Sequence, residues 1–335
     1  MFSNISAYFR KIFRKIRNCV CYDKHMDNST IRNKADELLR ESFNKLSDVK
    51  TSNLSDKVYH YTSAEGLKGI IENNCLWFSD IEYLNDETEI KYVYNIILDL
   101  IKDNNLNLHE RLYQFIINRC DYINCSNYFK SELNIALNDR YYIASFSNKR
   151  DSLTLWNNYT KSINNTGYNI GFNRSNLLTS IKVNNIDKND NYIHGNVIYS
   201  KNKQLKMLKD LINKFNELYL ETFEEHLLFQ YLGISLKVYS LFFKKECFKE
   251  EDEYRIVIDK KQDIQARDIS SSFRVHKGLF IPYIKPSLDK ECIEEIYISP
   301  TIKEKLYNAS VERMLNRYDY PDGIDVINSE IPLRY

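Results

Sequence analysis

The stretch VYHYTSAEGLKGIIENNCLWFSDIEYLND, Val58 to Asp86, decides how we expect this chain to fold. Its first five residues predict a short strand, because side chains alternate between the two faces of a strand. His60 and Thr62 then share one face, and Tyr61 lies on the other. A histidine and a threonine at a strand end, beside a helix N-terminus, are suited to hold a ribose or an amide.

A helix is predicted directly after this strand. Ser63 is a suitable N-cap, and Glu65 lies in the first turn, where a negative charge suits the helix dipole. Apolar residues at helical spacing form its buried stripe, and the pair Asn73-Asn74 ends it. A second strand is expected over residues 75–79, and Asn85-Asp86 is expected to cap a further helix.

Composition bounds the class of protein. The chain has 335 residues, a net charge of +1, seven cysteines and only eight glycines. A near-neutral charge indicates no overall attraction to nucleic acid, although a local basic patch is compatible with it. No CxxC pair, no glycine-rich phosphate loop and no apolar run of about 18 residues occurs, which favours a cytoplasmic protein with reduced thiols.

Residues 1–24 predict a basic amphipathic helix, with large apolar residues at helical spacing and arginines and lysines between them. Such a helix would lie on an anionic membrane or a partner, or pack on its own domain or on a second copy. A second helix is expected over 31–46, capped by Asn28-Ser29-Thr30. We therefore divide the chain into N-terminal helices over 1–50 and one domain over 51–335.

The rest of the chain alternates between strands and helical blocks. Helical blocks are expected near 87–138 and 203–245, and a polar loop over 182–191. Asp151-Ser152 is expected to cap a short helix, and Thr301 a helix that runs to about residue 317. Further strands are expected over 141–147, 167–172, 195–199, 247–259, 293–299 and 323–328. This pattern predicts an α+β domain with a mostly antiparallel sheet.

Three fragments contain residue types that suit cleavage of an N-glycosidic bond. They are His60-Tyr61-Thr62, then Ser145-Phe146-Ser147 with Trp156 and Tyr159, then Glu251-x-Glu253-x-Arg255. That reaction passes through an oxocarbenium-like state, which a carboxylate near the ribose stabilises. Glu251 and Glu253 would supply carboxylates. Two adjacent carboxylates repel, so the pKa of one would rise unless Arg255 on the same strand face neutralises them. Each fragment also fits a purely structural role.

The same reaction needs a polar grip on the base and the ribose and an aromatic wall for a ring. His60 and Thr62 would supply the grip. Tyr61, Trp156 or Tyr159 would supply the wall, and Ser145 and Ser147 are small hydroxyls that share one face of a strand.

The motifs HYTSAEGLKGII, SFS with a following W..Y, GYNIGF, FKEEDEYR and IEEIYISP…NSEIPLRY together resemble the bacterial family called domain of unknown function 2971, over about 58–335. That family in turn resembles the ADP-ribosyltransferase superfamily. The resemblance implies a split, mostly antiparallel sheet with helical insertions, here with an N-terminal helical extension. It also implies NAD as substrate and a toxin or antiphage effector that modifies nucleic acid or protein.

The resemblance also implies roles for particular residues. Glu253, with Glu251 as rival, would be the catalytic carboxylate. The residues that would contact NAD are His60, Tyr61, Thr62, Ser145, Ser147, Trp156, Tyr159 and Arg255.

Two other classes of function fit the same residues. In a non-catalytic module the cleft would hold a nucleotide or a partner loop, and lysine or arginine side chains would occupy both carboxylates. In a metal-dependent nuclease, Glu251 and Glu253 would act with Lys260 or Lys261. A partner antitoxin or self-association through the N-terminal helices is a further expectation.

Overall fold

The computed structural model describes residues 26–47, 56–83, 88–103, 106–124, 139–160, 166–185, 191–261, 272–276 and 278–332. The helix expected over 1–24 and the cap expected at Asn85-Asp86 lie outside these residues. None of the helices described is both long enough and apolar enough to cross a bilayer.

Ten strands of the described part form one largely antiparallel sheet, as the sequence predicts. Their order is β10-β9-β4-β1-β3-β2-β8-β7, and β6 and β5 continue the sheet from the other edge of β3. Only β10 and β9, among these described strands, pair in parallel. The bounds are β1 Lys57–Thr62, β2 Phe78–Asp80, β3 Asp139–Ser147, β4 Tyr168–Asn173, β5 Asn191–Asn196, β6 Glu253–Lys261, β7 Ser272–His276, β8 Leu279–Ile284, β9 Ile293–Ile298 and β10 Asp325–Asn328.

The sheet divides along one edge of β3. Strand β1 meets β3 at Tyr59↔Ser147, whereas β2 meets it at Ser79↔Ile143. Strand β6 pairs with β3 over its whole length, so β1 and β2 share the remaining edge. They diverge beside residues 144–146, and the two wings β1-β4-β9-β10 and β2-β8-β7 separate there.

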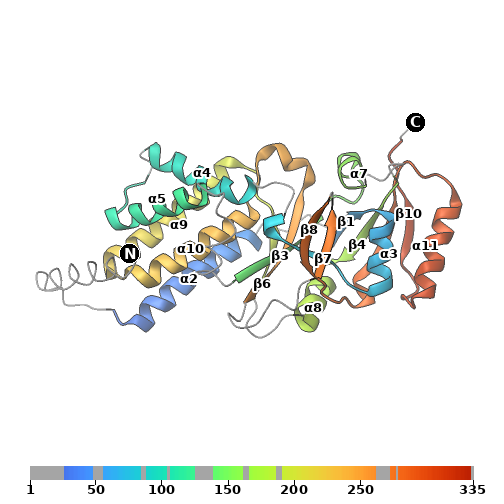
Figure 1. Ribbon diagram of the computed structural model, residues 1–335, viewed down its shortest axis with the longest axis horizontal. Coiled ribbons are helices and arrows are strands. Elements are labelled where there is room, and N and C mark those ends of the chain that lie inside the picture. Colours follow the sequence, from blue (N-terminus) through green and yellow to red (C-terminus); the bar gives the residue numbers. More distant parts are fainter. Residues whose placement is uncertain are drawn as a thin grey trace, which may run out of the picture.

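Helices cover both faces of this sheet, and a helical lobe extends from one end of it (Figure 1). We call the face beneath α10 the α10 face, because Lys237 of that helix lies 3.9 Å above the ring of Tyr141. The opposite face, on which α3, α8 and α11 pack, is the α3 face. The helix bounds are α2 Asn28–Ser47, α3 Ala64–Asn73, α4 Thr88–Lys102, α5 Glu110–Asn124, α7 Leu153–Tyr159, α8 Arg174–Asn185, α9 Lys201–Thr222, α10 Glu225–Phe242 and α11 Lys305–Arg317.

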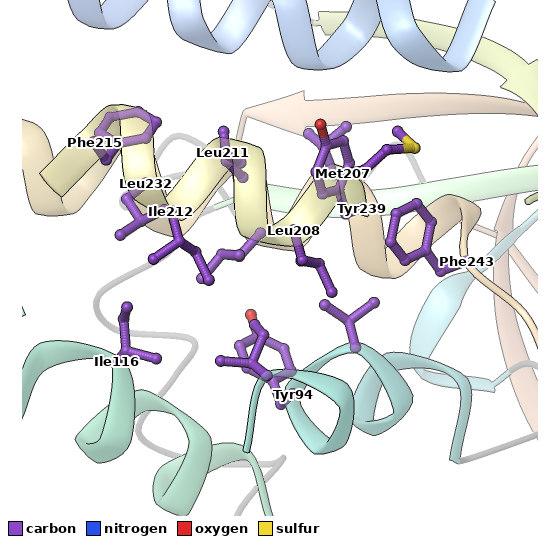
Figure 2. Close-up of a cluster of buried hydrophobic side chains, with 14 of the residues drawn as sticks. Tyr94, Ile116, Met207, Leu208, Leu211, Ile212, Phe215, Leu232, Tyr239 and Phe243 are labelled. Carbon is purple, nitrogen blue, oxygen red and sulfur yellow. The ribbon is translucent and has the colours of Figure 1, made fainter. Parts of the chain in front are cut away.

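The helical lobe has its own apolar core, made by the stripes of α4, α5, α9 and α10 (Figure 2). Leu208, Ile212 and Leu232 are fully buried in it, and Tyr94 of α4 faces them. The same core continues onto the α10 face through Ile143 and other residues of the sheet. Burial of apolar surface therefore fixes the lobe against the sheet.

The segment from β1 to β2 forms as its sequence predicts. The Ser63 hydroxyl accepts a hydrogen bond from Gly66 N at 3.1 Å, which caps α3. Asn74 ends the helix in the left-handed conformation, with φ 47°. Strand β2 is shorter than expected and begins at Phe78, whereas Cys75 forms an isolated bridge with Ser287.

Two elements differ from the prediction because tertiary contacts outweigh local composition. The polar stretch expected as a loop over 182–191 begins inside helix α8, which buries Leu177 and Ile181 against the sheet. The strand expected over 247–259 begins only at Glu253. A 3-10 helix, Glu246–Glu251, precedes it, and the left-handed Asp252 (φ 42°) interrupts the chain between them.

Further element boundaries differ from those predicted from the sequence. Strand β5 occupies 191–196 instead of 195–199. Helix α11 begins at Lys305, after the N-cap Glu304, and the Thr301 hydroxyl is hydrogen-bonded to that of Ser299. The cap of α2 is Asp27, whose carboxylate accepts from Thr30 N at 2.8 Å. The hairpin of β7 and β8 was not predicted at all.

Candidate functional site

The register of three strands decides which predicted site residues meet. Ser147 pairs with both Tyr59 and Glu253, and Ser145 pairs with Arg255. Directly paired residues of antiparallel strands point to the same face. Ser145, Ser147, Glu253 and Arg255 therefore all lie on the α10 face.

His60 and Thr62 lie on the opposite, α3 face, which corrects the expectation that they share a cleft with Glu253. The His60 ring packs 5.7 Å from Phe146, and its Nδ1–H donates to the Ser145 carbonyl oxygen at 3.1 Å. Burial lowers the pKa of His60, and the bond to the carbonyl opposes that shift. His60 thereby satisfies a carbonyl that is left without a ladder partner where β1 and β2 diverge.

Thr62 is held by the helix that follows it. A Cβ added to Gly66 would lie 2.0 Å from Thr62 Oγ1, so the Thr62 hydroxyl fits against α3 only because Gly66 has no side chain. This close packing fixes Thr62 against α3, away from the carboxylates.

Glu253 is buried and fully engaged. Its two oxygens accept from Arg255, Nε to Oε1 at 2.6 Å and Nη2 to Oε2 at 2.9 Å, and Lys244 Nζ lies 3.3 Å from Oε2. Glu253 is 5% exposed and Arg255 2%. Burial raises the pKa of Glu253, but the charges of Arg255 and Lys244 outweigh it and lower the pKa to about 2. Arg255 therefore neutralises Glu253, whereas Glu251 pairs with Lys244.

Glu251 lies next to this pair but nearer the surface. It belongs to the 3-10 helix and not to the strand, so it joins Glu253 through Lys244, whose Nζ is 2.6 Å from Glu251 Oε2. The hydroxyl of Tyr159 donates to Glu251 Oε1 at 3.0 Å, and the Tyr159 residue is 44% exposed. Glu251 is therefore the less buried carboxylate of the pair, with 12% of its side chain exposed against 6% for Glu253.

The two serines differ in their surroundings. Ser147 is buried, donates to the Glu251 carbonyl at 2.7 Å and accepts from Lys149 N at 3.0 Å, so it holds the loop after β3. Ser145 is exposed at the division of the sheet, and a hydrogen bond from its side chain helps to lower the pKa of Glu253.

Tyr61 and Trp156 use their rings and polar atoms for contacts within the protein. Their rings meet edge to face at 4.9 Å, and both residues are buried. The Tyr61 hydroxyl donates to the Lys149 carbonyl at 2.9 Å and accepts from Ser152 N, and Trp156 Nε1 donates to Asp151 at 2.6 Å. Of the predicted aromatic walls, only Tyr159 presents a substantial surface to solvent.

Two residues of this region were missed from sequence. Lys244 is 7% exposed and arrives through the bridge between Ile198 and Phe243, which no local pattern signals. Trp77 is 49% exposed, and its place beside Phe78 at the start of β2 was a usable signal, since alternation sends one of two adjacent residues outward.

The arrangement separates the groups that the nuclease hypothesis combines. Lys260 lies seven residues beyond Glu253 on β6, about 23 Å at the rise of a strand. No group of three or more histidine, cysteine or acidic side chains suited to hold a metal ion occurs among the residues the structure describes.

A family model described as "Protein of unknown function (DUF2971)" matches residues 155–256, which run from α7 into β6. The match supports the resemblance to this family over that stretch, which contains Trp156, Tyr159, Glu251, Glu253 and Arg255. Comparison with curated proteins and with solved structures gave no significant match.

Proposed function

We propose that this chain is a nucleotide-binding module in which Glu253 does not act as a catalytic carboxylate. The observation that carries the proposal is the bidentate pair of Glu253 with Arg255, with Lys244 on the same carboxylate. A carboxylate that stabilises a ribosyl cation must turn toward the ligand. Glu253 has both oxygens occupied and is buried, so its charge is used within the protein.

The α10 face beside the division of the sheet supports nucleotide binding. Ser145 presents a hydroxyl there, which suits a ribose or an amide. The hydrogen bond from the Tyr159 hydroxyl to Glu251 holds the tyrosine on the same face. Its exposed ring offers a surface on which a base would stack. NAD is the ligand to test first, because the family that the motifs resemble itself resembles the ADP-ribosyltransferases, which use NAD.

ADP-ribosyl transfer from NAD, by a toxin or antiphage effector, is a second candidate, with Glu251 as the carboxylate. Two observations favour it over a scheme based on Glu253. Glu251 is nearer the surface, and the exposed Tyr159 contacts it directly. The division of the sheet next to Ser145 also agrees with the split sheet that the resemblance implies.

Calorimetry with NAD and an assay of nicotinamide release from labelled NAD separate the two candidates. We expect the wild-type protein to bind NAD without releasing nicotinamide, and a Glu251→Gln variant to do the same. Release that Glu251→Gln abolishes and Glu250→Gln preserves would establish the transferase instead. The control is matched because Glu250 is a neighbouring, exposed glutamate. Absence of NAD binding would refute the proposal.

A further inference from the structure

Five side chains gather on the α10 face of the β2-β8-β7 wing. Ser79 pairs with Tyr283, which pairs with Ser272, so these residues and Arg274, two positions on, share one face. Trp77 reaches the same place, because its ring lies 4.5 Å from that of Tyr283. None of these residues belongs to the carboxylate cluster described above.

Arg274 carries a half-buried positive charge without a described counter-ion. One Nη donates to Ser79 Oγ at 3.1 Å, and the buried Nε has no hydrogen-bond partner. Within the described ranges no carboxylate forms an ion pair with it. Burial accordingly lowers the pKa of Arg274, and a nearby Tyr283 opposes this. A guanidinium in such a place is suited to receive an anion, and its planar donors match phosphate oxygens.

Trp77 supplies an aromatic surface close to that charge. Its ring is tilted by 33° against the buried Tyr283, which fixes one side and leaves Trp77 49% exposed. Trp77 directly precedes β2, and two residues of extended chain, about 7 Å, separate it from Ser79. The pair Ser79↔Ile143 puts Trp77 and Ser145, each two residues away along its chain, on the same α10 face.

We propose that this wing holds the nucleoside diphosphate part of a nucleotide, with the base on Trp77 and the phosphates on Arg274. The inference rests on the proposed function and specifies where its ligand binds. Trp77 and Ser145 share the α10 face, so the rest of a ligand seated on Trp77 would reach the Ser145 hydroxyl along that face. Stacking on an exposed ring tolerates any base, whereas the guanidinium requires the phosphates.

ADP is the probe, with adenosine as its counterpart without phosphate. Binding to the full chain is followed by calorimetry and by tryptophan fluorescence, in which Trp77 is the exposed reporter because the only other tryptophan, Trp156, is buried. We expect Arg274→Gln to weaken ADP about tenfold or more and leave adenosine unchanged, with Arg274→Lys intermediate. Trp77→Ala should weaken both ligands about tenfold and abolish the quenching.

Arg313→Gln is the matched control, since Arg313 is an exposed arginine on α11. ADP affinities in Arg274→Gln and Trp77→Ala equal to that of Arg313→Gln would overturn the inference, and NAD binding would then leave the proposed function standing. Nicotinamide release would overturn the non-catalytic function and leave this binding site intact. Circular dichroism verifies that each variant is folded. If Arg274→Gln does not fold, the weaker binding of ADP by Arg274→Lys serves as the test instead.

Discussion

Replacing Glu253 by glutamine removes one charge from a buried ion pair and leaves the other. Arg255 then keeps its hydrogen bond to the Leu241 carbonyl at 2.7 Å but loses the Glu253 carboxylate as counter-ion at 2% exposure. Breaking a buried pair in this way destabilises proteins by about 3–5 kcal/mol. The lowered pKa agrees, because a fall from 4.5 to about 2 corresponds to about 3 kcal/mol at about 1.4 kcal/mol per pH unit.

The lowered pKa also predicts how the loss of unfolding free energy in Glu253→Gln depends on pH. A carboxyl whose pKa is lower in the folded state stabilises the protein above its unfolded pKa, near 4.5, and this stabilisation is lost as the pH falls toward 2. The difference between wild type and Glu253→Gln should therefore be largest at pH 7 and fall to roughly half at pH 3.

Urea unfolding followed by circular dichroism measures both quantities. Glu250→Gln is the control, because the Glu250 carboxylate is exposed and pairs with Lys149 at the surface, and we expect this variant to match wild type. A double variant, Glu253→Leu with Arg255→Met, should recover most of the loss, since an apolar pair of similar size replaces both charges. A loss below about 1 kcal/mol in Glu253→Gln, or one independent of pH, would refute the assigned role of this pair.

Three further substitutions test the packing that positions the site, each by urea unfolding. Gly171→Ala should destabilise the protein by about 1–3 kcal/mol, because the added Cβ would lie 2.5 Å from Glu295 Cγ beneath the sheet. Gly69→Ala, in open space on α3, should instead stabilise it by up to about 1 kcal/mol, and equal effects at both glycines would contradict this account. Ser63→Ala should cost about 1 kcal/mol, because Gly66 N loses its cap, and an unchanged stability would show that the cap is dispensable.

The sequence by itself determined the local elements around β1. Alternation separated His60 from Tyr59 and Tyr61, and the structure places them on opposite faces. The caps of α3 and the antiparallel α+β class were also predicted correctly. These features depend on neighbours a few residues apart, so spacing and residue type suffice to predict them.

Only the tertiary structure decided which faces and partners combine. Alternation orders the side chains within one strand, but the pairing Tyr59↔Ser147 joins strands 88 positions apart and sets which of their faces coincide. That register places His60 and Glu253 on opposite faces of the sheet. The packing of the helical lobe brought Lys244 onto the carboxylates, and the β7-β8 hairpin brought Arg274 to Ser79. Contacts over such separations depend on how the whole core packs, which no short pattern encodes.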